Sequence, residues 1–117
     1  MKPLVYIAGP YSTPDPVENT RHAIRVGMML YETGLAIVEI PHLTMLAHFL
    51  DPRPIDYWYD FDLDKLAHCD AVWRIKGESA GADKEVEEAW KLDIRVFTSV
   101  AHEWDKLIEF CRERVSA

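Results

Sequence analysis

The sequence predicts an α/β fold, a single-domain doubly wound parallel sheet of about four to five strands. Short apolar runs recur along the 117 residues, and unbroken apolar runs are typical of strands covered on both faces. Segments with helical periodicity separate these runs, and such alternation indicates parallel strands joined by right-handed crossovers. A chain of this length buries one core, so we expect one domain over residues 1–117.

The first half of the chain is predicted to supply two strands and two helices. Residues 4–8 form the first apolar run, which Gly9-Pro10 ends. Asp15 is the expected N-cap of a long helix, and Gly34 is its expected stop. A second strand is expected over 35–40 and a short amphipathic helix over 43–50. The inward stripe of the long helix is predicted to hold Val17, Ile24, Met28 and Tyr31, with Ala23, Gly27 and Leu30 beside them.

The second half repeats the alternation. Asp56 is the expected cap of a helix that runs to His68. Further elements are expected as a strand over 70–75, a helix over 77–93, a strand over 94–98 and a closing helix over about 104–115. The predicted strand order is 2-1-3-4, which is a flavodoxin- or Rossmann-like arrangement.

A strand order of 2-1-3-4 puts the switch point between strands 1 and 3, where ligands bind at the carboxyl edge of the sheet. We therefore expect the loops 9–12 and 76–81 to face one another across a crevice. Glu85 lies early in the helix that follows the second loop, and we expect the helix dipole to favour its charged, nucleophilic form. The alternative is that Glu85 and its acidic neighbours only stabilise the helix from its surface.

The composition of the chain limits the kinds of molecule that we expect the protein to bind. A net charge of −7 argues against a nucleic-acid surface, because phosphates need clustered Lys and Arg. Neither the two cysteines nor the five histidines have metal-ligand spacing, so no metal and no cofactor are predicted. The N-terminal apolar run is too short for a signal peptide or a membrane span, so we expect a cytoplasmic protein with reduced thiols and no membrane contact.

Three motifs together resemble the nucleoside 2-deoxyribosyltransferase family, which includes relatives that hydrolyse deoxynucleoside 5′-monophosphates. They are YIAGPYS near the N-terminus, DLDKLAHCDAVW around Asp62, and SAGADKE, which ends at Glu85. Each motif is short, and their order and spacing carry the resemblance from about residue 4 to about residue 98.

The resemblance implies an enzyme without a cofactor that cleaves or transfers at the N-glycosidic bond. Glu85 would be the nucleophile that forms a covalent glycosyl ester, with Asp62 beside it and Tyr6 near it, in the manner of a retaining glycosidase. In the transferases an aspartate precedes the nucleophile by six residues, whereas this chain has Ser79 there, as the monophosphate hydrolases do. The resemblance therefore favours a phosphorylated substrate, although no Arg closely follows the 9–12 loop.

Five further residues are candidates for binding a nucleoside or nucleotide: Gly9, Ser12, Ser79, Gly81 and His42. Each has a structural alternative, since glycines form turns, Ser79 is also a natural N-cap, and a lone histidine is more often structural. Trp73, late in the third strand, is a candidate for stacking on a base.

Two alternatives concern the whole chain. Ser79 in place of the transferase acid also suits a non-catalytic nucleotide-binding or sensing module. Apolar helix faces on a small sheet, together with the resemblance, lead us to expect a homodimer or a higher homo-oligomer.

Overall fold

A computed structural model describes residues 1–117 and contains a four-stranded sheet, five α-helices and one short 3-10 helix. In chain order the elements are β1 (Leu4–Ala8), α1 (Pro16–Tyr31), β2 (Ile37–Glu39), η1 (Pro41–Leu43), α2 (Thr44–Leu50), α3 (Ile55–Leu66), β3 (Ala71–Arg74), α4 (Ala80–Lys91), β4 (Arg95–Thr98) and α5 (Glu103–Ser116). The strands lie in the order β2-β1-β3-β4, and every neighbouring pair is parallel. The predicted α/β class, parallel sheet and strand order are confirmed.

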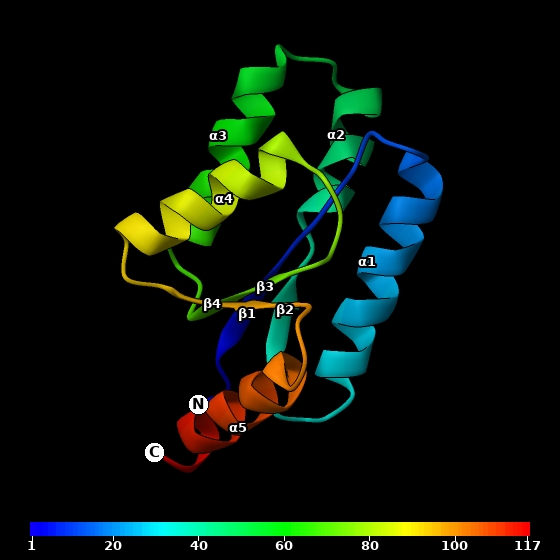
Figure 1. The fold of residues 1–117 in the computed structure, drawn as a ribbon. Helices are drawn as coiled ribbons and strands as arrows, with labels where there is room; N and C mark the ends of the chain where they lie inside the picture. The colour runs from blue at the N-terminus through cyan, green and yellow to red at the C-terminus, as the bar shows by residue number, and fades with distance from the viewer.

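Helices cover both faces of the sheet (Figure 1). Leu30 of α1 and Leu107 of α5 join one buried cluster, so these two helices pack on one face. Leu66 of α3 and Ala89 of α4 join a second cluster on the other face. Because the strands are parallel, their carboxyl ends share one edge of the sheet, where the chain after β1 and the chain after β3 emerge together.

The buried face of α1 differs from the predicted stripe. Three residues of that stripe are exposed, Val17 by 65%, Met28 by 37% and Tyr31 by 52%, whereas Ile24 is partly buried against the core. Ala23, Gly27 and Leu30, which were predicted beside the stripe, are buried. The reason is a close approach of the helix to the chain after β2, because a Cβ on Gly27 would lie 2.8 Å from Ile40 Cδ1. The buried face is therefore centred on Ala23, Gly27 and Leu30, and hydrophobicity alone placed the centre of the stripe wrongly.

Of the two predicted N-caps at Asp15 and Asp56, the first is confirmed and the second is wrong. The Asp15 side chain accepts hydrogen bonds from two backbone N–H groups of α1, as predicted. Asp56 is not the cap of α3, which begins one residue earlier after Pro54, a residue that makes no side-chain cap. The extended backbone of Pro54 leads directly into the helix, so Asp56 falls within its first turn, where an acid still suits the helix dipole. None of the helices has the length and apolar character that crossing a membrane requires.

Candidate functional site

A cavity of about 230 Å³ opens at the carboxyl edge of the sheet, between the loops after β1 and β3 and the helices α3 and α4. The predicted crevice between the two loops is therefore present. Of the eight candidate site residues, seven line the cavity: Gly9, Ser12, His42, Asp62, Ser79, Gly81 and Glu85. The eighth, Tyr6, lies beneath it.

Tyr6 and Glu85 form a buried pair at the base of this cavity. Tyr6 lies in β1, at the centre of the sheet, and is completely buried. Its Oη donates a hydrogen bond to Glu85 Oε2. Glu85 is only 9% exposed and shares the inward face of α4 with Ala82 and Ala89. It is therefore not a surface acid of the helix, and the phenol fixes the direction of its carboxyl group.

Burial controls the proton equilibrium of Glu85. Desolvation raises the pKa of Glu85 to about 7, the negative charge of Asp62 adds to the rise, and the Tyr6 hydrogen bond and Arg74 oppose it. The expectation that the helix dipole favours the charged form is thus wrong. Glu85 lies six positions after the N-cap Ser79, beyond the first turn in which the dipole acts strongly, and desolvation exceeds what remains of it.

Asp62 is the second carboxylate of the cavity. It projects from α3, its side chain is 15% exposed, and its Oδ1 accepts a hydrogen bond of 2.7 Å from Thr44 Oγ1. Burial raises the pKa of Asp62, while the Thr44 bond and the nearby Lys65 lower it. The charge of Asp62 contributes to the raised pKa values of both Tyr6 and Glu85, which places the three groups in one electrostatic cluster.

His42 is held in a neutral form at the mouth of the cavity. It lies in η1, is 5% exposed, and its Nε2 donates to the carbonyl oxygen of Pro10 at 2.8 Å. Because a carbonyl only accepts, the proton sits on Nε2, and Nδ1 is a buried acceptor without a partner. Burial lowers the pKa of His42, so the ring is uncharged at neutral pH. His42 therefore links the segment that follows β2 to the loop after β1 through this hydrogen bond.

The two loops that face the cavity touch one another. Gly77 has a φ of +127°, and a Cβ there would lie 2.8 Å from Pro10 Cγ. A Cβ on Gly9 would lie 2.9 Å from Ile75 Cβ, so this glycine serves the close approach of the two strand ends. Arg74 fastens the second loop, donating to the carbonyl oxygens of Ile75 and Gly77 and pairing with Asp83 of α4 at 3.0 Å.

The remaining polar candidates lie around the cavity opening. Ser79 is the N-cap of α4, and its Oγ accepts a hydrogen bond of 3.0 Å from the Ala82 N–H, so the structural role expected for it is present. Its hydroxyl hydrogen is free for a ligand. Ser12 and Gly81 are exposed at the rim.

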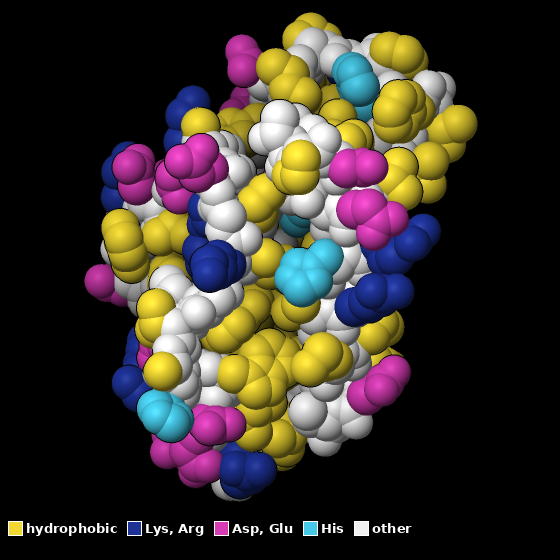
Figure 2. Space-filling model, turned by 45° about the vertical axis from the view of Figure 1, so that its right-hand side comes forward, with side chains coloured by type: hydrophobic (Ala, Val, Ile, Leu, Met, Phe, Trp, Pro, Cys, Tyr) yellow, Lys and Arg dark blue, Asp and Glu magenta, His cyan; other side chains and the backbone are white.

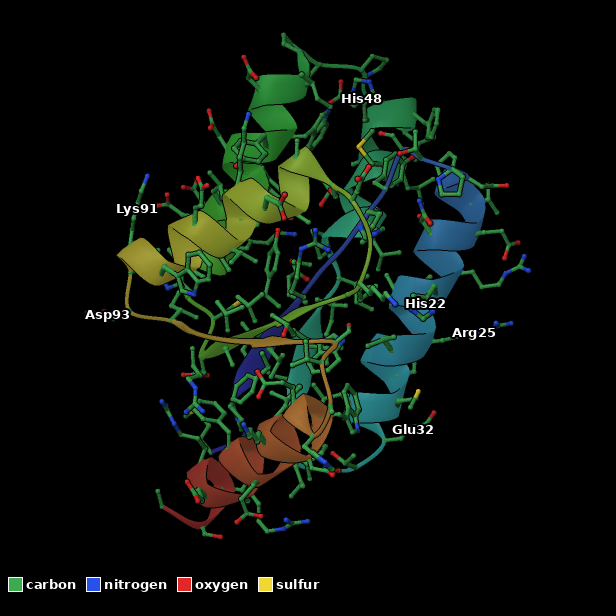
Figure 3. All side chains as sticks on the ribbon, viewed as in Figure 1. His22, Arg25, Glu32, His48, Lys91 and Asp93 are labelled. Atoms are coloured by element: carbon green, nitrogen blue, oxygen red, sulfur yellow. The ribbon has the colours of Figure 1, made fainter.

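An aromatic wall completes the cavity, and its two residues from α3 were not predicted to belong to the site. Trp58 and Tyr59 of α3 line it, together with Tyr11 from the loop after β1. Trp58 Nε1 donates to Nδ1 of His48, a residue of α2, at 2.9 Å, and Figure 3 labels His48 on the side of α2 that is nearer to α3. The signal was available, because residues 58 and 59 precede Asp62 by one helical turn and therefore share its side of α3.

Trp73 is not part of this wall. Its ring belongs to the cluster on the opposite face of the sheet and meets Trp104 of α5 edge-on, with ring centroids 5.0 Å apart. Trp73 is therefore a core residue, as is typical of a tryptophan in a strand, and the alternative that it stacks on a base at the crevice is wrong, because its position in β3 directs it to the α1 and α5 side.

No protein-family model matches the chain, and no curated protein matches it significantly. No cluster of three or more His, Cys, Asp or Glu side chains has the geometry to hold a metal ion. The chemistry of the cavity therefore follows from its own groups. It offers a buried carboxyl group oriented by a phenol, a second carboxylate beside it, and aromatic walls that suit a flat ring.

Proposed function

We propose that this protein cleaves or transfers at the N-glycosidic bond of 2′-deoxynucleosides or their 5′-monophosphates, with Glu85 as the nucleophile. The observation that carries the proposal is the buried Tyr6–Glu85 hydrogen bond at the base of a cavity that also holds Asp62. A carboxylate directed into a pocket by a fixed donor, with a second acid nearby, is the arrangement that retaining glycosyl transfer needs.

The reaction proceeds in two displacements. An oxygen of ionised Glu85 attacks C1′, the C1′–N bond breaks, and its electron pair leaves with the base, which takes up a proton from Asp62 or from water. Water or a second base then attacks C1′ and gives up a proton to Asp62 or to solvent, and the C1′–O bond to Glu85 breaks with release of its carboxylate. The absence of a 2′-hydroxyl eases both steps, because the transition state carries positive charge on the sugar.

The other residues of the cavity have supporting parts in this proposal. Tyr6 holds the carboxylate of Glu85 in one direction, and Asp62 is the acid nearest to the leaving base. Trp58 and Tyr59 supply flat surfaces on which a base can stack. Ser12, Ser79, Gly9, Gly81 and His42 contact the sugar or its phosphate. The cavity lining contains no Lys or Arg, so a phosphate would depend on the serine hydroxyls and the N–H groups of α4.

The test is release of free base from a panel of deoxynucleosides and their 5′-monophosphates, with and without an acceptor base. We expect Glu85→Gln to lower kcat by about 10³-fold or more, because it removes the nucleophile. Glu87→Gln is the matched control, since Glu87 is an exposed acid of the same helix. A sugar trapped on Glu85 by a 2-fluorinated substrate and found by mass spectrometry would support the covalent step. Equal base release by wild type and Glu85→Gln would contradict it.

A non-catalytic nucleotide-binding or sensing module is the second candidate. It is favoured by the raised pKa of Glu85, because a carboxyl group that is half protonated at pH 7 accepts and donates hydrogen bonds but is a poor nucleophile. Calorimetry with the same ligands decides between the two. Tight binding with no base released over hours supports the module, and turnover that depends on Glu85 excludes it.

We also propose that the protein works as a homodimer or a higher homo-oligomer. Exposed apolar side chains gather over α2 (Figure 2), including Leu46 at 63% and Phe49 at 73% exposure. They line a groove between α1 and α2 that shares Tyr11, His42 and Met45 with the cavity. A second copy on this groove would therefore also form a wall of the candidate site.

A further inference from the structure

A chain of polar side chains runs from Asp62 away from the cavity and across the sheet face. Lys65 lies one turn after Asp62 on α3, and its Nζ is 3.7 Å from Asp62 Oδ1. The same ammonium group forms an ion pair with Glu39 of β2. On the other side, Thr44 of α2 donates to Asp62 Oδ1 at 2.7 Å. Asp62 is thus held from two elements, and Lys65 is shared between two carboxylates.

The sheet register explains why these groups meet. Glu39 pairs with Tyr6 in the parallel β1–β2 ladder, so the two side chains leave the sheet on the same face. Tyr6 donates to Glu85 on that face, and Lys65 reaches Glu39 on it from α3. The charged pair Glu39–Lys65 therefore lies on the same side of the sheet as the pair Tyr6–Glu85. Asp62 contacts Lys65 of the first pair, and its charge acts on both members of the second.

The charges around Asp62 are unbalanced without Lys65. The titratable groups that face Asp62 are Tyr6 from β1, Glu39 from β2, Lys65 from α3 and Glu85 from α4. Among these only Lys65 is a cation. Two like charges at a buried site cannot both ionise easily. Lys65 favours the charged form of Asp62, whereas Arg74 of β3 favours that of Glu85, so these two cations decide which carboxyl group loses its proton first.

We propose that Lys65 is a positioning residue that, with Thr44, fixes the Asp62 carboxylate and holds it ionised, so that the proton retained by the two acids near neutral pH sits on Glu85. Glu85 must lose this proton, or pass it to Asp62, before it can attack C1′, so the inference deepens the proposed function by limiting the pH at which it operates. Its consequence for catalysis rests on that function. The proton assignment itself does not, because it is a property of the free protein.

Removal of the Lys65 charge has opposite effects on the two acids. Asp62 loses its cation and becomes harder to ionise, so its pKa rises. Glu85 then has a neutral neighbour in place of a negative one over the same pH range, so its pKa falls. A purely structural lysine would move neither titration in this paired way.

The experiment is a ¹³C NMR titration of the side-chain carboxyl groups, with Asp62→Asn and Glu85→Gln used for assignment. In Lys65→Met we expect the Asp62 midpoint to rise by about one pH unit or more and the Glu85 midpoint to fall by less. Lys65→Arg keeps the charge and should leave both near their wild-type values. Lys91→Met is the matched control, because Lys91 also lies in the last turn of a helix and points away from the site (Figure 3).

Thr44→Val provides a second variant, in which loss of the donor should raise the Asp62 midpoint while the Lys65 charge remains. Lys65 is 36% exposed, so methionine can be accommodated, and thermal unfolding checks that each variant is folded. The inference is overturned if the Asp62 midpoint in Lys65→Met moves no more than in Lys91→Met, or if both midpoints rise together. If wild type releases no base, the proposed function fails while the titration still decides the role of Lys65.

Discussion

At the scale of single residues, Glu85 is a carboxyl group in an environment that disfavours its charged form. Its pKa is about 7 in the folded protein against 4.5 for a free side chain. Between these two pH values the unfolded chain gives up the proton while the folded chain keeps it. The folded state therefore has its full stability from this group below about pH 4.5 and loses it as the pH rises through 7.

Glu85→Gln should consequently stabilise the protein, but only at high pH. Glutamine cannot ionise and can still accept the Tyr6 hydrogen bond. We expect the free energy of unfolding at pH 8 to exceed that of wild type by up to about 3 kcal/mol, and to be similar to it at pH 4. Urea unfolding at both values measures this. Glu87→Gln should show no such pH dependence, and an advantage for Glu85→Gln that is the same at both pH values would refute the buried-acid explanation.

At the scale of elements, the site depends on two loops held in contact at the ends of β1 and β3. The loop after β3 has a left-handed backbone at Gly77, which lies against Pro10 of the loop after β1. Pro10 in turn accepts the His42 hydrogen bond. A distortion at Gly77 therefore reaches both the cavity rim and the histidine.

Two glycines of this region should respond to alanine in opposite ways. Gly77→Ala forces a side chain into a φ of +127° and against Pro10 Cγ, so we expect a loss of about 1–3 kcal/mol of stability. Gly81→Ala is the control, because Gly81 lies in the first turn of α4 and its Cβ would be 4.0 Å from the nearest atom. We expect this change to stabilise by less than about 1 kcal/mol. Thermal or urea unfolding compares them, and equal effects would contradict the contact between the loops.

The elements also show what the sequence could and could not predict. Apolar runs and turn residues predicted the four strands and five α-helices but not the short helix η1. The central strands β1 and β3 are largely buried, and most breaks have a glycine, a proline or a cap. Rotation of a helix about its axis was less predictable. Gly27 faces inward because the sheet comes close, and Lys65 meets Glu39 because strand register and helix position coincide. Such contacts depend on tertiary distances that no local pattern contains.

At the scale of the whole molecule, most of what could be predicted about the candidate site follows from the strand order. The order β2-β1-β3-β4 brings the ends of β1 and β3 together, so residues from distant parts of the chain line one cavity. This was predictable from alternating strands and helices. The proton state of Glu85 was not, since it depends on how deeply one face of α4 is buried, which outweighs the helix dipole.

In a single copy of the molecule, one apolar surface is not covered by any other element. The groove between α1 and α2 is lined by apolar side chains, among them Val17, Leu46 and Phe49, which are exposed by 65%, 63% and 73%. Arg21 and Arg25 lie in its lining, and Figure 3 shows Arg25 directed away from the body of the molecule. Because the groove and the cavity share residues, association there would change access to Glu85 as well as cover apolar surface.

Sedimentation velocity at micromolar concentration tests this surface. We expect wild type to sediment as a dimer or larger, and the double variant Leu46→Asp/Phe49→Asp to sediment as a folded monomer, because charges placed in an apolar interface oppose association. The monomer should also lose base release, since one wall of its cavity is missing. Trp90→Asp is the control, because Trp90 is 63% exposed but lies on α4, outside the groove, and it should leave the assembly intact. A monomeric wild type with full activity would show that the groove has no part in the site, whereas dissociation by Trp90→Asp alone would place the interface on α4.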